Sequence, residues 1–191
     1  FLEGRHSTLA CQLMKGGNPI MPGPIVGIVL GSKSDLFVGK KAAETLGELG
    51  VPYEITVASA HRTPDDVTVY ARKARERGIQ VLIGVAGLSA ALPGVLAANS
   101  LLPIVAVPVS SGTLGGKDAL FAVTQMPPGI PVGSMGIDAG KNAALMAARI
   151  LSLHDEALRN RLEAYNKAAS DKIRIDRKEL EGFPVAPEEA F

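Results

Sequence analysis

Residues 25–35 read IVGIVLGSKSD, and this stretch decides the fold class of the chain. Its apolar half, bounded by proline and glycine, is typical of a strand that is buried on both faces. Ser34 and Asp35 then open a helical pattern that we expect to end near Leu49, with Gly50 as its C-cap. A buried strand that leads through a glycine-containing loop into a helix is the repeating unit of an α/β protein.

The same alternation of strand and helix continues along the chain. Further strands are expected at 53–58, 81–85, 104–108 and 132–137, and further helices at 63–77, 90–98, 119–125, 142–153 and from 156 to 170 and beyond. Thr63 is the expected N-cap of its helix, with Pro64 in the first turn. Repeated units with right-handed crossovers predict a flavodoxin-like three-layer α/β/α sandwich, with a five-stranded parallel sheet and a C-terminal helical extension.

The domain organisation follows from this pattern. Residues 1–23 are interpreted as a disordered extension or a remnant of an expression vector, because the convincing domain pattern starts only after Met21. Residues 24–170 form the expected catalytic α/β domain with its C-terminal helix. Residues 171–191 form a C-terminal tail that is mobile or docks on a partner.

Composition narrows the classes of function. The net charge is +1, and Lys and Arg alternate with acidic residues, so no nucleic-acid partner is expected. The single cysteine excludes a disulfide framework, and the three histidines are too far apart in sequence for a metal motif, so no metal site is expected. No apolar run approaches the roughly 20 residues of a membrane span. These features predict a cytoplasmic protein without a membrane partner.

Polar loops follow several of the expected strands. In an open parallel sheet, ligands bind beyond the carboxyl ends of the strands. The loops in question are 31–35, 59–64, 86–94 and 110–116. Because all of them belong to the same end of the sheet, we expect them to form one binding site.

The first two loops carry the groups with chemistry. Backbone N–H groups at the start of the first helix favour an anion, although Ser34 there could simply cap the helix. His61 can exchange protons near neutral pH, and Arg62 offers a fork for phosphate. A solvated His–Arg pair on the surface is the alternative.

The other two loops are rich in small residues. Loop 86–94 has almost no charge, so its backbone can approach a flat ligand closely, or it is only a tightly packed turn. The glycine-rich loop 110–116 is either a lid that clamps a ligand or merely flexible.

Five motifs in order resemble the aminoimidazole ribonucleotide carboxyl-transfer family. They are GSKSD (31–35), SAHRTPD (59–65), AGLSAALPG (86–94), QMPPGIPVGS (125–134) and KNAALMAARIL (141–151), and the resemblance covers roughly residues 25–168. Bacterial members are N5-carboxyaminoimidazole ribonucleotide mutases. Animal members and some microbial ones are carboxylases that use carbon dioxide directly. The resemblance implies an enzyme of purine biosynthesis that needs no cofactor.

The resemblance also implies roles for particular residues. The nucleotide would contact Ser32, Ser34 and Asp35; its phosphate would be held by Ser59 and Arg62; His61 would be the general acid and base; and the imidazole and the migrating carboxyl would be bordered by Gly87, Ser89 and Ala90. The family implies a homo-oligomer, an octamer, in which the C-terminal helices embrace neighbouring subunits.

One departure from the family pattern leaves the branch open. Ala91 stands where bacterial mutases usually carry histidine, and Ser89 resembles the serine of some carboxylases. Arg62 and the 125–134 motif resemble the mutases instead. A flavodoxin-like module that binds flavin or another nucleotide is a more remote alternative, because only 4% of the residues are aromatic and none is tryptophan.

Overall fold

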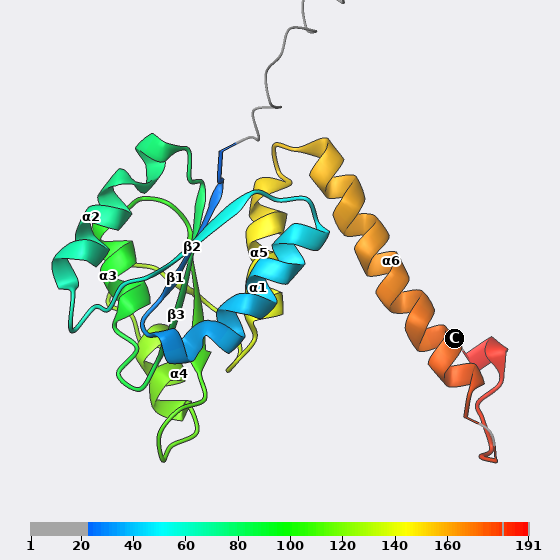
Figure 1. Cartoon of the computed structure of the whole chain (residues 1–191). Coiled ribbons are helices and arrows are strands. Elements are labelled where there is room, and N and C mark those ends of the chain that lie inside the picture. Colours follow the sequence, from blue (N-terminus) through cyan, green and yellow to red (C-terminus); the bar gives the residue numbers. More distant parts are fainter. Residues whose placement is uncertain (1–22, 181, 191) are drawn as a thin grey trace, which may run out of the picture.

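A five-stranded parallel sheet forms the centre of the computed structural model, which describes residues 23–180 and 182–190 (Figure 1). The strand order is β2-β1-β3-β4-β5. The strands are β1 (Val26–Leu30), β2 (Tyr53–Val57), β3 (Val81–Gly87), β4 (Ile104–Val109) and β5 (Gly133–Ser134). The interpretation of residues 1–23 as an extension falls, apart from Gly23, outside the described residues.

Helices cover both faces of this sheet. They are α1 (Leu36–Glu48), α2 (Pro64–Ala74), α3 (Leu92–Asn99), α4 (Lys117–Thr124), α5 (Gly140–Leu151) and α6 (Glu156–Lys178), with short 3-10 turns η1 (Lys33–Asp35), η2 (Arg75–Arg77) and η3 (Glu188–Ala190). α1 and α5 pack together on one face, and α2 and α3 pack together on the other (Figure 1). The predicted flavodoxin-like α/β/α sandwich is therefore confirmed.

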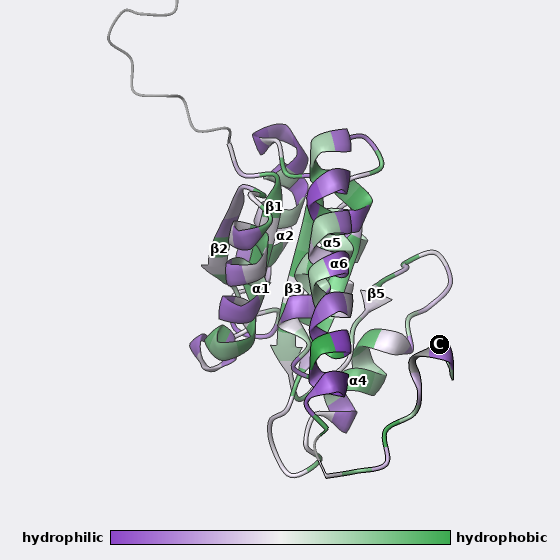
Figure 2. Ribbon diagram, turned by 90° about the vertical axis from the view of Figure 1, so that its right-hand side faces the viewer, coloured by the Kyte–Doolittle hydropathy of each residue, from purple (hydrophilic) through white to green (hydrophobic). Residues whose placement is uncertain are grey.

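The burial of each strand follows its place in the sheet. Every residue of β1 and of β4 is buried, as continuous apolar runs predict for strands that are covered on both faces. β2 lies at the sheet edge, and its residues alternate between exposed and half-buried. Figure 2 shows hydrophobic residues concentrated in β3 and in α5, whereas α1 and α6 carry many hydrophilic ones.

The register of the sheet brings the loops to one level. Val26 at the start of β1 pairs with Tyr53 on one side and with Val81 on the other, so these strands run in step. Leu30 at the end of β1 likewise lies beside Val57 and Val85. The loops that follow these strands consequently leave the sheet at the same edge, which is where an open parallel sheet binds ligands.

β5 is shorter than the sequence predicts. The expected strand at 132–137 contributes only Gly133–Ser134 to the sheet. The segment still follows β4, since the Met135 N–H donates to the Ala106 carbonyl at 2.8 Å and the Asp138 N–H donates to the Pro108 carbonyl at 2.9 Å. These contacts are spaced too irregularly for a longer regular ladder.

α6 begins on the body of the protein and then leaves it. Leu158 and Leu162 are buried against the rest of the core, and the Arg161 Nε donates to the Leu49 carbonyl at 2.8 Å. The remainder of the helix projects away from the sheet and continues to Lys178, past residue 170, which is the expected end of the catalytic domain (Figure 1). None of the helices in residues 23–180 and 182–190 has the length and apolar character that a membrane span requires.

Candidate active site

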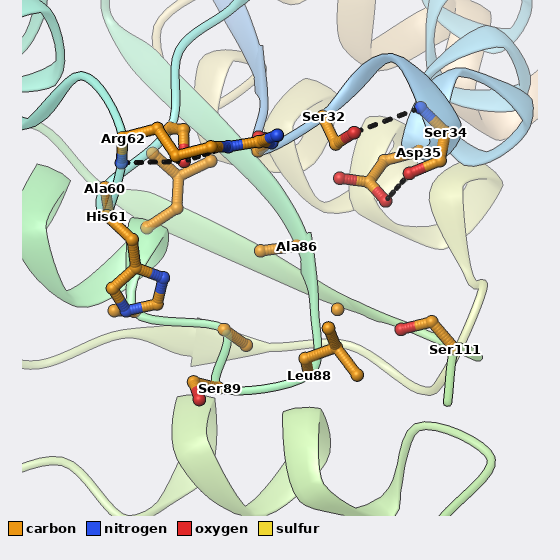
Figure 3. Close-up of a pocket in the computed structure, with 16 residues that line it drawn as sticks. Ser32, Ser34, Asp35, Ala60, His61, Arg62, Ala86, Leu88, Ser89 and Ser111 are labelled. Atoms are coloured by element: carbon orange, nitrogen blue, oxygen red, sulfur yellow. Dashed lines mark hydrogen bonds between the residues drawn. The ribbon is translucent and has the colours of Figure 1, made fainter. Parts of the chain in front are cut away.

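A cavity of about 500 Å³ lies where the loops after β1, β2, β3 and β4 meet (Figure 3). This volume is in the usual range for sites that bind small molecules. Every residue that the sequence singles out lines the cavity: Ser32, Ser34, Asp35, Ser59, His61, Arg62, Gly87, Ser89 and Ala90. The predicted convergence of the loops is therefore confirmed, while the roles of the individual residues stay predictions.

The first loop delivers a buried carboxyl group to the cavity. Ser32, rather than Ser34, occupies the cap position of η1, and its hydroxyl accepts a hydrogen bond from the Ser34 N–H at 3.4 Å. The Ser34 hydroxyl donates to Asp35 Oδ1 at 3.3 Å. Asp35 is only 6% exposed. Burial raises its pKa, although hydrogen bonds from Ser32 and Ser34 and the charge of Arg62 act in the opposite direction.

The second loop is held against the first by Arg62. Its backbone N–H and its Nε both donate to the Ser59 hydroxyl, at 3.2 and 3.4 Å, and its Nη2 donates to the Gly31 carbonyl at 3.3 Å. His61 is exposed and turns its ring toward the cavity (Figure 3). The loop thus presents an imidazole to solvent and ligand while the neighbouring guanidinium is fixed.

Thr63 does not cap α2 as predicted. It stands at the N-cap position, but its hydroxyl makes no capping hydrogen bond. The Thr63 hydroxyl instead accepts a hydrogen bond from the Ser59 N–H at 3.0 Å and donates one to the Ser59 carbonyl at 3.3 Å. The tight loop between β2 and α2 uses this hydroxyl to close on itself, and this closure shapes the site.

The third loop holds a strained turn. Leu88 and Ala90 adopt φ angles of +54° and +34°, a region that favours glycine. Such conformations cost about 1–3 kcal/mol each and persist where surrounding structure enforces them, commonly at functional sites. Here the Ala90 N–H donates to the Gly87 carbonyl at 3.0 Å, and Ala90 is buried. The turn places backbone and small side chains along the cavity wall.

Seven residues that were given no binding role from the sequence also line the cavity. The additional lining residues are Gly31, Ala60, Ala86, Leu88, Ala91, Leu92 and Ser111. Each of them lies in one of the four loops that the sequence placed at this edge of the sheet, so the loops themselves were the available signal. Ser111 lies in the predicted clamp loop 110–116. That loop is tethered by Asp138, whose carboxylate accepts from the Ser110 N–H at 2.9 Å and also from the Ser110 hydroxyl.

The arrangement suits an anionic ligand with a flat polar ring. Arg62 supplies positive charge for a phosphate, Asp35 can accept from sugar hydroxyls, and His61 can transfer a proton. Among the lining residues that the structure describes, there is no Phe, Tyr or Trp side chain on which an isoalloxazine could stack. Within residues 23–180 and 182–190, no group of three or more His, Cys, Asp or Glu is placed to hold a metal ion.

Fold and site together define an α/β protein that binds a small phosphorylated ligand at the carboxyl edge of its sheet. The family model described as AIR carboxylase matches residues 25–172. The chain therefore belongs to the AIR carboxylase family.

Curated relatives and a solved structure support this assignment. The chain is 50% identical over 158 residues to the N5-carboxyaminoimidazole ribonucleotide mutase of Pyrococcus horikoshii, covering 83% of this chain and 89% of that protein. It is 48% identical over 150 residues to the mutase of Escherichia coli, covering 78% and 89%. The phosphoribosylaminoimidazole carboxylase of Schizosaccharomyces pombe is 47% identical over 142 residues, which are 74% of this chain and 26% of that protein.

The solved structure of Treponema denticola PurE has the same fold. It superposes with a TM-score of 0.76 at 32% sequence identity, covering 83% of this chain and 99% of that chain.

Proposed function

We propose that this chain is an N5-carboxyaminoimidazole ribonucleotide mutase of purine biosynthesis. It converts N5-carboxyaminoimidazole ribonucleotide into 4-carboxy-5-aminoimidazole ribonucleotide. The observation that carries the proposal is the joint placement of His61, Arg62 and Asp35 on one cavity, in a chain of the AIR carboxylase family. Mutases of two organisms are each about half identical to it.

The ribonucleotide is held by its charged end. Arg62 uses its Nε and Nη2 within the protein and has further N–H groups that can bind a phosphate. Ser59 completes the phosphate site, and Ser32 and Ser34 lie beside it on the next loop. Asp35 accepts hydrogen bonds from the ribose hydroxyls, because a buried carboxylate is best satisfied by such donors.

His61 moves one proton within each turnover. Its imidazolium donates to the exocyclic nitrogen as the N–CO₂ bond breaks, which releases carbon dioxide and the free amine. The ring carbon C4 then attacks carbon dioxide, forming the new C–C bond. Neutral His61 finally removes the C4 proton, which restores the aromatic ring and the imidazolium. Atoms and charge balance, and general acid–base catalysis of this kind contributes roughly 10²–10⁴-fold.

The third loop confines the carbon dioxide. Gly87, Ser89, Ala90 and Ala91 line the cavity beside the reacting ring and offer little polar surface to water. A dry wall slows the escape and hydration of the gas before C4 attacks it. The strained backbone of Ala90 keeps this wall close to the ligand.

Exchange of a single histidine tests the proposal. His61→Asn should fold normally and lose at least 99%, about 10²-fold, of the wild-type kcat for N5-carboxyaminoimidazole ribonucleotide. His154→Asn is the matched control, because His154 is exposed and lies outside the cavity lining. Turnover by His61→Asn at the wild-type rate would refute the assignment of the proton to this residue. A wild-type protein without turnover would refute the function itself.

Direct carboxylation of aminoimidazole ribonucleotide is the second candidate. Ala91 and Ser89 favour it, since they depart from the usual mutase motif and both line the cavity. One assay separates the two reactions: purified protein receives either N5-carboxyaminoimidazole ribonucleotide or aminoimidazole ribonucleotide with bicarbonate. A mutase has the higher kcat/KM with the first substrate. Faster carboxylation with the second would assign the chain to the carboxylases.

We further infer that the chain works as a cytoplasmic homo-oligomer, an octamer. The distal part of α6 supports this, because Ile173 and Ile175 are 61% and 56% exposed and would be covered by a neighbouring subunit. A single cysteine suits a reducing compartment. Sedimentation analysis should give the mass of eight chains, and cell fractionation should find the protein in the soluble cytoplasmic fraction. A monomer at micromolar concentration would exclude the assembly.

A further inference from the structure

Ser111 has a buried hydroxyl that nothing in the described chain satisfies. Its Oγ is inaccessible to solvent and has no hydrogen-bond partner among residues 23–180 and 182–190. Buried polar groups in native proteins are almost always paired, so an unpaired one calls for a physical reason. A ligand that supplies the missing partner is such a reason when the group lines a binding cavity, as Ser111 does.

The loop fixes this hydroxyl in place. The preceding residue, Ser110, is bound through its N–H and its hydroxyl to the Asp138 carboxylate. On the cavity side, Ser111 Oγ lies so close to Gly87 that a Cβ on that residue would overlap it. Figure 3 shows the Ser111 oxygen directed toward the interior of the drawn site. The loop therefore holds the hydroxyl in place, and only a residue without a side chain at position 87 leaves room for it.

Ser111 and His61 bound the cavity from opposite ends. Ser111 follows β4 and His61 follows β2, and β1 and β3 lie between those strands. Three strand spacings correspond to about 14 Å along the sheet edge. In Figure 3 the two side chains lie on opposite sides of the cavity, with Ala86 and Leu88 between them. A ring whose reacting edge faces His61 thus turns its other edge toward Ser111.

We propose that Ser111 is a substrate-binding residue whose hydroxyl donates a hydrogen bond to the base of the ribonucleotide. The acceptor is the ring nitrogen that carries no ribose, which has a free lone pair on the edge away from the exocyclic amine. Ser111 then orients the ring so that C4 faces His61. This inference rests on the proposed function, because it takes the aminoimidazole ring as the ligand.

Ser111→Ala tests the proposal, with Ser152→Ala as the matched control. The Ser152 hydroxyl donates to the Arg149 carbonyl at 2.8 Å at the end of α5, away from the cavity lining. Each variant is assayed with N5-carboxyaminoimidazole ribonucleotide, and ribose 5-phosphate is used as a competitive inhibitor. That inhibitor keeps the sugar and the phosphate but lacks the base. Melting temperature without ligand reports on folding.

We expect Ser111→Ala to raise KM about three- to tenfold, the usual effect of one lost hydrogen bond. The inhibition constant of ribose 5-phosphate should not change. The melting temperature should be equal or higher, since the substitution removes an unsatisfied buried hydroxyl, and this combination distinguishes ligand binding from a structural role. Ser152→Ala should behave as wild type in KM and inhibition.

Two results would overturn the inference while leaving the proposed function intact. One is an unchanged KM in Ser111→Ala. The other is a parallel rise of KM and of the ribose 5-phosphate inhibition constant, which would place the hydroxyl against the sugar or the phosphate. If the wild-type protein turns over neither N5-carboxyaminoimidazole ribonucleotide nor aminoimidazole ribonucleotide with bicarbonate, the function fails, and the role of Ser111 fails with it.

Discussion

Glu54→Gln should destabilise the protein by about 2 kcal/mol at pH 7 without affecting catalysis. Glu54 on β2 accepts a hydrogen bond from the Tyr70 hydroxyl on α2 at 2.6 Å. Arg77 in η2 donates to both carboxylate oxygens, at 2.8 and 2.6 Å, and its guanidinium stacks over the Tyr70 ring at 4.9 Å. These three residues, here termed the Glu54 clamp, join the edge strand to the helix that covers it.

The size of the effect follows from exposure. The side chains of Arg77 and Glu54 are 41% and 26% exposed, so their ion pair contributes no more than about 1 kcal/mol. The Tyr70 bond is half-buried, and its change from a charged to a neutral acceptor costs about 1 kcal/mol more. Burial alone would raise the pKa of Glu54, but hydrogen bonds from Arg77 and Tyr70 outweigh it and hold that pKa below 4.5.

The lowered pKa of Glu54 determines whether the clamp's contribution to stability rises or falls with pH. The clamp stabilises the fold fully above the unfolded pKa of 4.5 and loses this contribution as pH falls through the lower folded value. The difference in unfolding free energy between wild type and Glu54→Gln should therefore be constant from about pH 6 to pH 8. It should shrink below about pH 4.5.

Urea denaturation followed by circular dichroism measures this difference, at one fixed protein concentration because subunit association affects apparent stability. Tyr70→Phe is the matched variant: it keeps the ring, loses one hydrogen bond and should cost about 1 kcal/mol. The kcat of both variants should equal that of wild type, since the clamp lies at the ends of β2 and α2 remote from the loop that carries His61. A difference that stays the same at pH 7 and pH 4 would refute the reasoning.

Three further substitutions probe other parts of the molecule. Gly140→Ala places a methyl group against the Val38 carbonyl and should lower the unfolding free energy by about 1–3 kcal/mol; an unchanged urea midpoint would contradict the close α1–α5 contact. Arg62→Lys should raise KM about tenfold with little change in kcat, because lysine has no fork, and steady-state kinetics would contradict this if kcat fell instead. Asparagine can adopt the φ of +57° at position 138, so Asp138→Asn should leave the melting temperature unchanged. It weakens the hydrogen bonds to Ser110, so kcat/KM should fall about fivefold. Wild-type kinetics would show that these hydrogen bonds do not matter for catalysis.

Most of the fold could be predicted because the pattern is local. The apolar run that became β1 is bounded by proline and glycine, and the run that became β4 follows Pro103. Gly50 and Gly78 end their helical segments with φ of +64° and +92°. β5 could not be predicted to its full extent. The apolar residues of 132–137 form a strand-like pattern. How many of them pair with β4 depends on how the segment lies along that strand and on the left-handed backbone of Asp138.

The candidate site could likewise be predicted in part from the sequence. Parallel topology brings strand ends together, so the residues after β1, β2 and β3 could be placed on one cavity from sequence. Ser111 could be assigned only to a loop, because its significance depends on a contact with Gly87 that no local pattern encodes. The tether from Asp138 to Ser110 spans 28 positions and likewise leaves no signal in sequence. Thr63 has the residue type of a helix cap, but its hydroxyl is hydrogen-bonded to the N–H and the carbonyl of Ser59 instead.

The backbone of Leu88 and Ala90 has a bearing on how this protein can vary. Glycine at either position would relieve the backbone strain of the turn and so favour the folded chain. It would also make this wall of the cavity more mobile. A substitution that relieves the strain of this turn would therefore also loosen the cavity wall. Ala90 is only 3% exposed, so a side chain larger than a methyl group at this position would have to displace neighbouring atoms.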